Sequence, residues 1–345
     1  MLRLGSTGAA VAEVRARLAH LGLITDITAD PEVFDEDLDR AVRTFQQERG
    51  IGVDGIVGPV TFRRLDEARW QLGDRVLSYI PGRMMTGDDV VQLQRRLSEL
   101  GFDAGRLDGI FGKNTDQALR EFQAGVGVNA DGTCGPDTFR AFDRLIRTVS
   151  GGDARALRGH VTLAALQTGV ADKVVVIDAA GDVDAELCHA FAVRVEGRLA
   201  ALGTQAILSG RPGATNPAEA ERAEFANSVG ADIVVTLHVD TSDSPEPNGI
   251  ATFYYGHPGG GVHSHSGRML AEALHDELTH RTDRLDCGVH PRTWDLLRLT
   301  RMPAVRVELG YISNESDAQR LRSSGFQDAV AEGVAAAITR VCSPR

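Results

Sequence analysis

Apolar residues follow a helical period in the first part of the chain and a strand-like pattern in the second. One apolar helix face is formed by Val11, Val14, Leu18 and Leu21. Gly22 then ends this helix, because glycine is favoured just past a helical C-terminus. Later, short apolar runs such as KVVVIDA and ADIVVTLHVD alternate with longer amphipathic segments. The pattern predicts small helical units followed by an α/β domain.

The second part alternates strands with helices. The predicted helices cover residues 185–203, 218–230, 266–282 and 326–342, and the predicted strands cover 173–179, 204–209, 231–240, 249–256 and 304–311. Such an alternation predicts a mixed sheet flanked by helices. Functional side chains in these sheets lie at the carboxyl ends of strands, which is where His238 and Glu308 come.

The first part repeats itself. The segment from Gly8 to Gly22 matches the segment from Gly87 to Gly101. Farther on, Phe-Gln is followed after a fixed spacing by Asp-Gly, Gly-Pro and Thr-Phe in both copies, at residues 45–62 and 122–139. The Asp-Gly steps supply tight turns between helices. Each copy is therefore predicted to be a small all-α domain of three helices.

This repeated pattern resembles the peptidoglycan-binding-like helical domain found beside many cell-wall enzymes. Copy two is the fuller match, because it carries Asp108-Gly109-Ile110-Phe111-Gly112 where copy one has PEVFDEDLDR. The repeated Gly, Phe and Leu are expected to build the cores, and a ligand would bind elsewhere on the surface. We expect the two repeats at 1–70 and 81–147, a linker at 148–171 and the α/β domain at 172–345.

Composition and charge exclude few classes of protein. The chain has 345 residues, 42% of them hydrophobic and 25% charged, as in ordinary globular proteins. Its net charge of −11 disfavours a nucleic-acid partner, since duplex affinity comes largely from neutralised phosphates. No signal peptide or membrane-spanning run is recognised, and the four cysteines lack CxxC spacing. These features predict reduced thiols and a cytoplasmic location, with export by an unseen route as the alternative.

Residues 172–342 resemble the zinc-dependent N-acetylmuramoyl-L-alanine amidases of type 3. The segments that carry the resemblance are ERAEFANSVGADIVVTLHVD, NGIATFYYG and RTWDLLRLTRMPAVRVELGYISN. Together with the two repeats, the layout is similar to that of actinobacterial CwlM-type amidase-like regulators. The resemblance implies a zinc-amidase-like fold. In active members it also implies cleavage of the amide between the muramic acid lactyl group and the stem peptide.

The family site uses a His after the first strand, a Glu at the start of the next helix, a second His and a final Glu. Three nitrogen and oxygen ligands hold Zn²⁺ and leave a position for water, whose pKa the metal lowers. The final Glu moves the proton of that water. The resemblance places the second His at His238 and the catalytic Glu at Glu308.

The other two family positions are changed in this sequence. Ala180 and Gly181 stand where the first His is expected, after Asp178. The ligand Glu falls at Asp184, whose side chain is shorter, and Glu186 is a weaker alternative. The sequence therefore predicts an incomplete zinc site, to which Zn²⁺ binds only if a further ligand is recruited.

A histidine-rich tract is the sequence's only obvious source of such a ligand. GHPGGGVHSHSG contains His257, His263 and His265. Short tracts of this kind can bind metal, but a solvated loop is the simpler interpretation. Residues that bind substrate are not predicted.

Three hypotheses about function remain open. The first is a cytoplasmic regulator of peptidoglycan-precursor synthesis with an impaired zinc site. For it, the resemblance implies a partner such as UDP-N-acetylglucosamine enolpyruvyl transferase. The second is an active zinc-dependent N-acetylmuramoyl-L-alanine amidase that acts on the wall. The third is a non-catalytic module that binds peptidoglycan fragments, muropeptides or precursors through its repeats.

Overall fold

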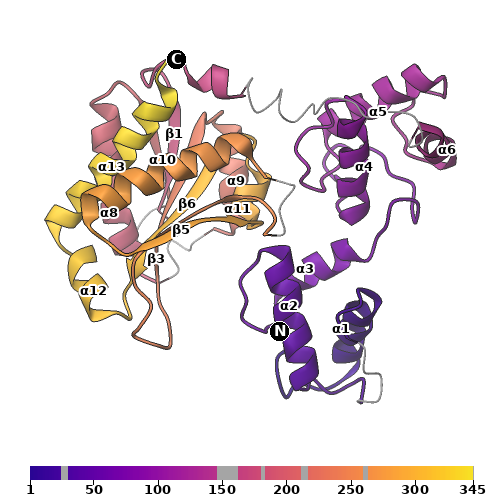
Figure 1. Ribbon diagram of the computed structural model, residues 1–345, viewed down its shortest axis with the longest axis horizontal. Coiled ribbons are helices and arrows are strands. Elements are labelled where there is room, and N and C mark those ends of the chain that lie inside the picture. Colours follow the sequence, from indigo (N-terminus) through magenta and orange to yellow (C-terminus); the bar gives the residue numbers. More distant parts are fainter. Residues whose placement is uncertain (25–29, 146–161, 180–182, 211–216, 259–262, 345) are drawn as a thin grey trace. The chain divides into compact units, whose positions relative to one another are not determined.

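The chain forms two compact units, which are described separately below. The structure, a computed structural model, describes residues 1–24, 30–145, 162–179, 183–210, 217–258 and 263–344. The first unit covers Met1–Arg158 and the second Gly159–Arg345. Figure 1 shows helices alone in the first unit and a sheet with helices in the second.

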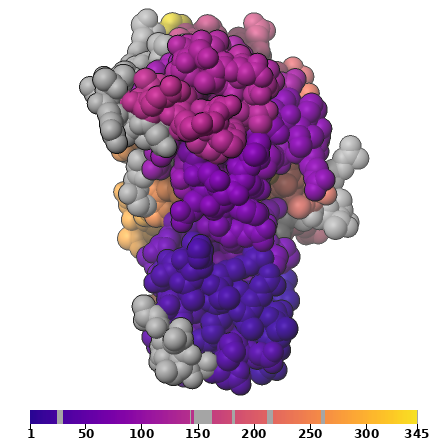
Figure 2. All heavy atoms as spheres, turned by 90° about the vertical axis from the view of Figure 1, so that its right-hand side faces the viewer, coloured from indigo at the N-terminus to yellow at the C-terminus, as the bar shows by residue number. Residues whose placement is uncertain are grey.

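The first unit contains the predicted three-helix copies. Their helices are α1 (Ala9–His20), α2 (Glu36–Arg49) and α3 (Pro59–Ala68) in copy one, and α4 (Asp88–Glu99), α5 (Lys113–Val126) and α6 (Pro136–Leu145) in copy two. Figure 2 shows this unit in space-filling form, with copy one in indigo and copy two in purple to magenta. Each copy has its own apolar core, and Phe122 stacks on Phe142 in the second at 4.2 Å between ring centroids. The predicted all-α repeats are confirmed.

A buried glutamine, Gln123, connects the turn at residues 131–133 of copy two to helices α5 and α6. Gln123 of α5 donates from Nε2 to Asp131 Oδ1 (3.2 Å), Thr133 O (3.0 Å) and Thr138 Oγ1 (3.1 Å). Its Oε1 accepts from Gly132 N, a glycine whose φ of 72° is in the left-handed region. Glycine is favoured here because this φ strains other residues, and a Cβ would also displace the Asp116 carboxylate, whose oxygen would lie 2.1 Å away. The spacing between Gln and Asp-Gly that the two copies share thus reflects one hydrogen-bond network, which joins the glutamine side chain to the turn.

The same network occurs three times in the unit. Gln46 of α2 binds Asp54 and Thr61, and Gln94 of α4 binds Asp108 and Thr115. It is therefore repeated within copy two, once before α5 and once after it.

Copy one replaces the remaining network by an ion pair. Arg15 of α1 occupies the position that Gln94 has in α4, seven residues after the matching glycine. Its guanidinium donates to Val33 O at 2.8 Å and pairs with Asp35 at 2.8 Å, and Asp35 also caps the start of α2. This exchange explains how PEVFDEDLDR forms a turn without an Asp-Gly step.

The second unit is built on one mixed sheet, as predicted, with six strands where the sequence predicted five. Its strands are β1 (Val174–Asp178), β2 (Gln205–Ser209), β3 (Ile233–Asp240), β4 (Ile250–Tyr255), β5 (Asp286–Arg292) and β6 (Ala304–Tyr311), in the order β2-β1-β3-β6-β4-β5. The sheet is mixed: β2, β1, β3 and β6 are parallel, while β4 runs antiparallel to β6 and parallel to β5.

Strand β5 was not predicted from the sequence. Its sequence, DCGVHPR, lacks alternation and contains both glycine and proline. It lies at the edge of the sheet, next to β4 only. Proline is tolerated there because an edge strand has N–H groups that need no partner strand.

Helices cover both faces of the sheet. The apolar face packs against α8 (Ala185–Ala200), α10 (His265–Thr282) and α13 (Ser324–Cys342). The opposite face carries α9 (Glu219–Ser228) and α11 (Asp295–Leu299), and α12 (Glu315–Leu321) follows β6 (Figure 1). Leu166, from the predicted linker 148–171, packs into the apolar core, while residues 146–161 lie outside the described residues.

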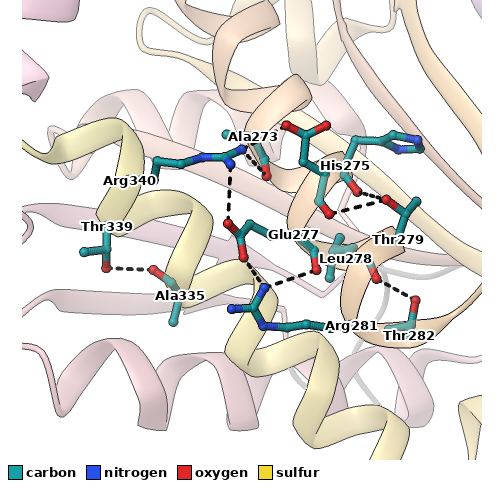
Figure 3. Close-up of polar contacts among 11 residues, drawn as sticks. Ala273, His275, Glu277, Leu278, Thr279, Arg281, Thr282, Ala335, Thr339 and Arg340 are labelled. Carbon is teal, nitrogen blue, oxygen red and sulfur yellow. Dashed lines mark hydrogen bonds and ion pairs between the residues drawn. The ribbon is translucent and has the colours of Figure 1, made fainter.

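Polar contacts of Arg340 join helices α10 and α13. Arg340 of α13 donates to Ala273 O at 3.1 Å and pairs with Glu277 at 3.4 Å, both on α10 (Figure 3). Gly333 permits close packing, since a Cβ there would lie 3.0 Å from Leu278 Cδ2. These contacts fix the layer behind the sheet, on the face away from His238.

No helix within the described ranges is both long and apolar enough to cross a membrane.

The glutamine network predicts a local stability effect. Gln123→Ala removes the hydrogen bonds to Asp131, Thr133 and the buried Thr138, and it leaves the buried N–H of Gly132 without its acceptor. We therefore expect a loss of about 2 to 3 kcal/mol of local stability. Hydrogen–deuterium exchange of α5 and α6 measures it. Gln117→Ala on the exposed face of the same helix is the control, and equal exchange in the two variants would refute a stabilising role for the network.

Candidate functional site

The parallel pairing of β3 with β6 places His238 directly opposite Glu308. Both strands alternate, so Leu237 and Val239 enter the apolar core while His238 faces α9 and α11. Both polar side chains are buried, with 5% of His238 and 6% of Glu308 exposed. The two residues that the sequence proposed as metal ligand and catalytic acid are therefore brought together.

A third residue, Arg306, lies between them. Its Nη2 is 2.9 Å from His238 Nδ1 and 3.2 Å from Glu308 Oε1. A guanidinium Nη carries two hydrogens, so one nitrogen can serve both partners. Arg306 is two residues before Glu308 on the same strand, and so shares its face of the sheet. A permanent cation thus occupies the space toward which His238 and Glu308 point.

The contact with Arg306 fixes the protonation of His238. Guanidinium only donates hydrogen bonds, so Nδ1 must accept and the imidazole proton resides on Nε2. Burial, followed by the charges of Arg306 and Arg222, lowers the pKa of His238 to about 3. His238 is therefore a neutral hydrogen-bond acceptor at physiological pH.

Burial acts on Glu308 in the opposite sense. It raises the pKa of the Glu308 carboxyl above its ordinary value, while the nearby charges of Arg306 and Arg292 oppose that rise. A buried carboxyl needs a charged partner to remain ionised, and Arg306 provides one. The positive charge of Arg306 therefore compensates the buried negative charge of Glu308.

Aromatic rings and a second carboxylate surround the guanidinium of Arg306. Its Cζ lies 4.5 Å from the ring centroid of Trp294, which in turn packs on Phe253 at 4.8 Å between centroids. Its Nη1 lies 3.8 Å from Oε1 of Glu219, at the start of α9. Stacking on an indole face suits a planar guanidinium. Arg306 is thus held by β3, β6, α9 and the segment before α11.

A second buried ion pair lies on the same face, where Asp178 of β1 is in register with Thr236, two residues before His238 on β3. Asp178, at the end of β1, pairs with Arg222 of α9 and accepts a 2.5 Å hydrogen bond from Ser209. Asp178 is 1% exposed. This pair anchors α9 on the sheet and so positions Glu219 as well.

The remaining predicted ligands are placed elsewhere. Asp184 caps the start of α8, where its Oδ1 accepts from Leu187 N at 3.0 Å and its Oδ2 lies 3.8 Å from Arg322. Glu186 is exposed in the first turn of that helix. Ala180 and Gly181, which replace the first family histidine, lie outside the described residues.

The histidine-rich tract does not supply a metal site in the part of it that the structure describes. His257 packs near Tyr255 and His263 near Tyr254, in edge-on ring contacts. Across all described residues, no three His, Cys, Asp or Glu side chains gather into a group that could hold a metal ion. With Arg306 between His238 and Glu308, the residues present do not fit the zinc that the family resemblance implies.

Sequence reasoning missed Arg306, Glu219 and Trp294. The signal for Arg306 was available: in AVRVELGY the apolar residues alternate with Arg306 and Glu308, which predicts a shared polar face. Glu219 could not be found in this way, because its approach depends on how α9 packs across the sheet.

Sequence comparison identifies two kinds of family match. A profile described as N-acetylmuramoyl-L-alanine amidase matches residues 172–340. A profile described as putative peptidoglycan binding domain matches residues 7–65 and 86–142, the two helical copies.

Individual relatives extend these matches. The N-acetylmuramoyl-L-alanine amidase CwlM of Mycobacterium tuberculosis is 44% identical over 363 residues, covering 99% of this chain and 89% of that protein. LytC of Bacillus subtilis is 30% identical over 154 residues, covering 45% of this chain and 30% of that protein. Among solved structures, the catalytic domain of the amidase CwlV from Bacillus (Paenibacillus) polymyxa var. colistinus is 29% identical with a TM-score of 0.44, covering 49% of this chain and 97% of that one.

The low pKa of His238 predicts a pH-dependent stability. Below its ordinary pKa of 6.5, the unfolded chain binds a proton at this residue, whereas the folded chain does not until about pH 3. Stability from this group is therefore complete above pH 6.5 and falls steadily as the pH drops toward 3. Nuclear magnetic resonance should show a His238 ring neutral at pH 5, with a higher pKa in Arg306→Met. A His238 that titrates near pH 6.5 would contradict this.

The network also predicts a coupling energy. Arg306→Met leaves the buried Glu308 without its charged partner and should destabilise the protein by about 3 kcal/mol in urea unfolding. Glu308→Gln in the same background should recover part of this loss, because the uncompensated carboxyl is removed. Arg268→Met, which breaks an exposed pair with Glu272, serves as control and should cost no more than about 0.5 kcal/mol. Equal losses in Arg306→Met and Arg268→Met would refute the coupling.

Proposed function

The chain belongs to the N-acetylmuramoyl-L-alanine amidase family, and we propose that it is a non-hydrolysing member that acts in peptidoglycan metabolism by binding. Its amidase domain has the mixed sheet with flanking helices, and the family resemblance assigns two of the family's site positions to His238 and Glu308. Its two repeats belong to the putative peptidoglycan-binding class.

The contact of Arg306 with both His238 and Glu308 carries this proposal. Hydrolysis of an amide needs an activated water and a group that can take its proton. The Nδ1 lone pair of His238 and an oxygen of Glu308 are both engaged by one guanidinium. These two atoms are therefore occupied by a cation, which competes with the activation of a water molecule.

The proposed ligand is a peptidoglycan fragment or precursor. The match of both helical copies to peptidoglycan-binding domains supports this ligand class. Residues that would touch it are not assigned, because the buried Gln, Phe and Leu of the repeats build their turns and cores.

The finer part of the proposal is a regulatory role in the cytoplasm, where precursors are made. It is supported by the contact of Arg306 with His238 and Glu308 and by the resemblance of the layout to CwlM-type regulators. On this proposal, the domains bind a precursor or fragment and a protein partner reads the result. UDP-N-acetylglucosamine enolpyruvyl transferase is the partner that the resemblance implies.

An assay on purified peptidoglycan tests the absence of hydrolysis. The full chain, with zinc added, should release no stem peptide from insoluble peptidoglycan, whereas an active amidase run in parallel should release it. The chain should nevertheless sediment with the polymer or bind soluble muropeptides. Release of stem peptide that disappears in Glu308→Gln would show that the chain is an active amidase and overturn the proposal.

The regulatory role has its own test. Affinity purification from the native host should recover an enzyme of precursor synthesis with the full chain, and the purified enzyme's rate should change when the chain is added. Failure of both results would leave binding to peptidoglycan as the function and remove the regulatory part.

A further inference from the structure

Three potential metal-ligating groups converge on the guanidinium of Arg306. His238 Nδ1 lies 2.9 Å from Nη2, Glu308 Oε1 lies 3.2 Å from Nη2, and Glu219 Oε1 lies 3.8 Å from Nη1. These groups come from β3, β6 and α9. Guanidinium is a donor only, so His238 Nδ1 accepts from it, while the Glu308 and Glu219 carboxylates lie at ion-pair distance. The arrangement is that of ligands around a cation, with an arginine as the cation.

We propose that Arg306 is a tethered cation that occupies and blocks a divalent-metal site formed by His238, Glu308 and Glu219. One imidazole nitrogen with two carboxylate oxygens is a donor set suited to Zn²⁺ and similar ions. The inference rests on the proposed non-hydrolysing function, for which it gives the physical cause.

The blocked site differs from the site expected from the sequence. Asp184, the expected third ligand, is used as a helix cap and is paired with Arg322. Glu219 lies near Arg306 because the ion pair of Arg222 with Asp178 holds α9 against the sheet. The other oxygen of Glu219 accepts from Leu296 N at 3.3 Å, which holds the carboxylate in place.

The guanidinium is held as a substitute ion rather than as a saturated hydrogen-bond donor. Its Nε is buried and has no hydrogen-bond partner among the described residues. Its plane is fixed instead by the Trp294 ring at 4.5 Å. Arginine stays charged at all accessible pH values, so the block is permanent.

Truncation of Arg306 tests the proposal directly. After dialysis against zinc chloride, Arg306→Ala should hold about one zinc per chain, while the native chain holds none above background. Arg306→Lys is the matched control, because it keeps a tethered cation and should remain metal-free. Adding Glu219→Gln or His238→Ala to Arg306→Ala should abolish the gained zinc. Cobalt(II) in place of zinc should give visible absorption bands in Arg306→Ala alone.

Two results would overturn the proposal. One is a folded Arg306→Ala chain that takes up no more zinc than the native chain. The other is a native chain that holds one zinc, which is lost in His238→Ala. If Arg306→Ala does not fold, Arg306→Met, which keeps the aliphatic volume, should show a melting temperature that rises with zinc, and an unchanged temperature would also refute the site.

The metal test is independent of the peptidoglycan assay. A native chain that neither hydrolyses peptidoglycan nor gains zinc on truncation would keep the proposed function and reject the blocked site. A native chain that hydrolyses peptidoglycan with bound zinc would reject both.

Discussion

The parallel pairing of β3 with β6 is the constraint on which the rest of the α/β domain depends. Its register sets His238 opposite Glu308, and strand alternation sends the intervening Leu237, Val239 and Val307 into the core. A shift of one residue would exchange the two faces, placing charges against α8, α10 and α13. Because both faces are covered by helices, the polar face must compensate its own charges inside the protein.

That compensation is achieved by arginines. Arg306 contacts both His238 and Glu308, and Arg222 pairs with Asp178, so these two buried acids each have a cation. Buried ion pairs of this kind specify one arrangement more than they add stability, because desolvation offsets most of the attraction. The polar face therefore has its buried charges compensated by side chains of the chain itself.

The sequence was sufficient for some of these features and insufficient for others. The repeats and five strands followed from periodicity and spacing, and so did the position of His238 and Glu308 near the carboxyl ends of two strands that prove to be neighbours. The metal-ligand and catalytic roles expected for them came only from the family resemblance. Strand β5 escaped because its glycine and proline are permitted only by its position at the edge. The alternation of β6 indicates that Arg306 shares the polar face with Glu308. Its contact with Glu219 could not be predicted, because that contact depends on how α9 packs on the sheet. Long-range contacts of this type leave no local pattern.

The repeated glutamine network gives helix α5 a particular mechanical position. Its first turn holds Thr115, which accepts from Gln94 of α4, and its third turn holds Gln123, which ties the loop before α6. A single rigid rod therefore ends one network and starts the next. Because α5 takes part in both networks, we expect the two loops of copy two to unfold together. In copy one, the Arg15–Asp35 ion pair stands in place of the first network. The two helical copies, which share the same fold, are thus stabilised at this position by different interactions: hydrogen bonds of Gln94 in copy two and an ion pair of Arg15 in copy one.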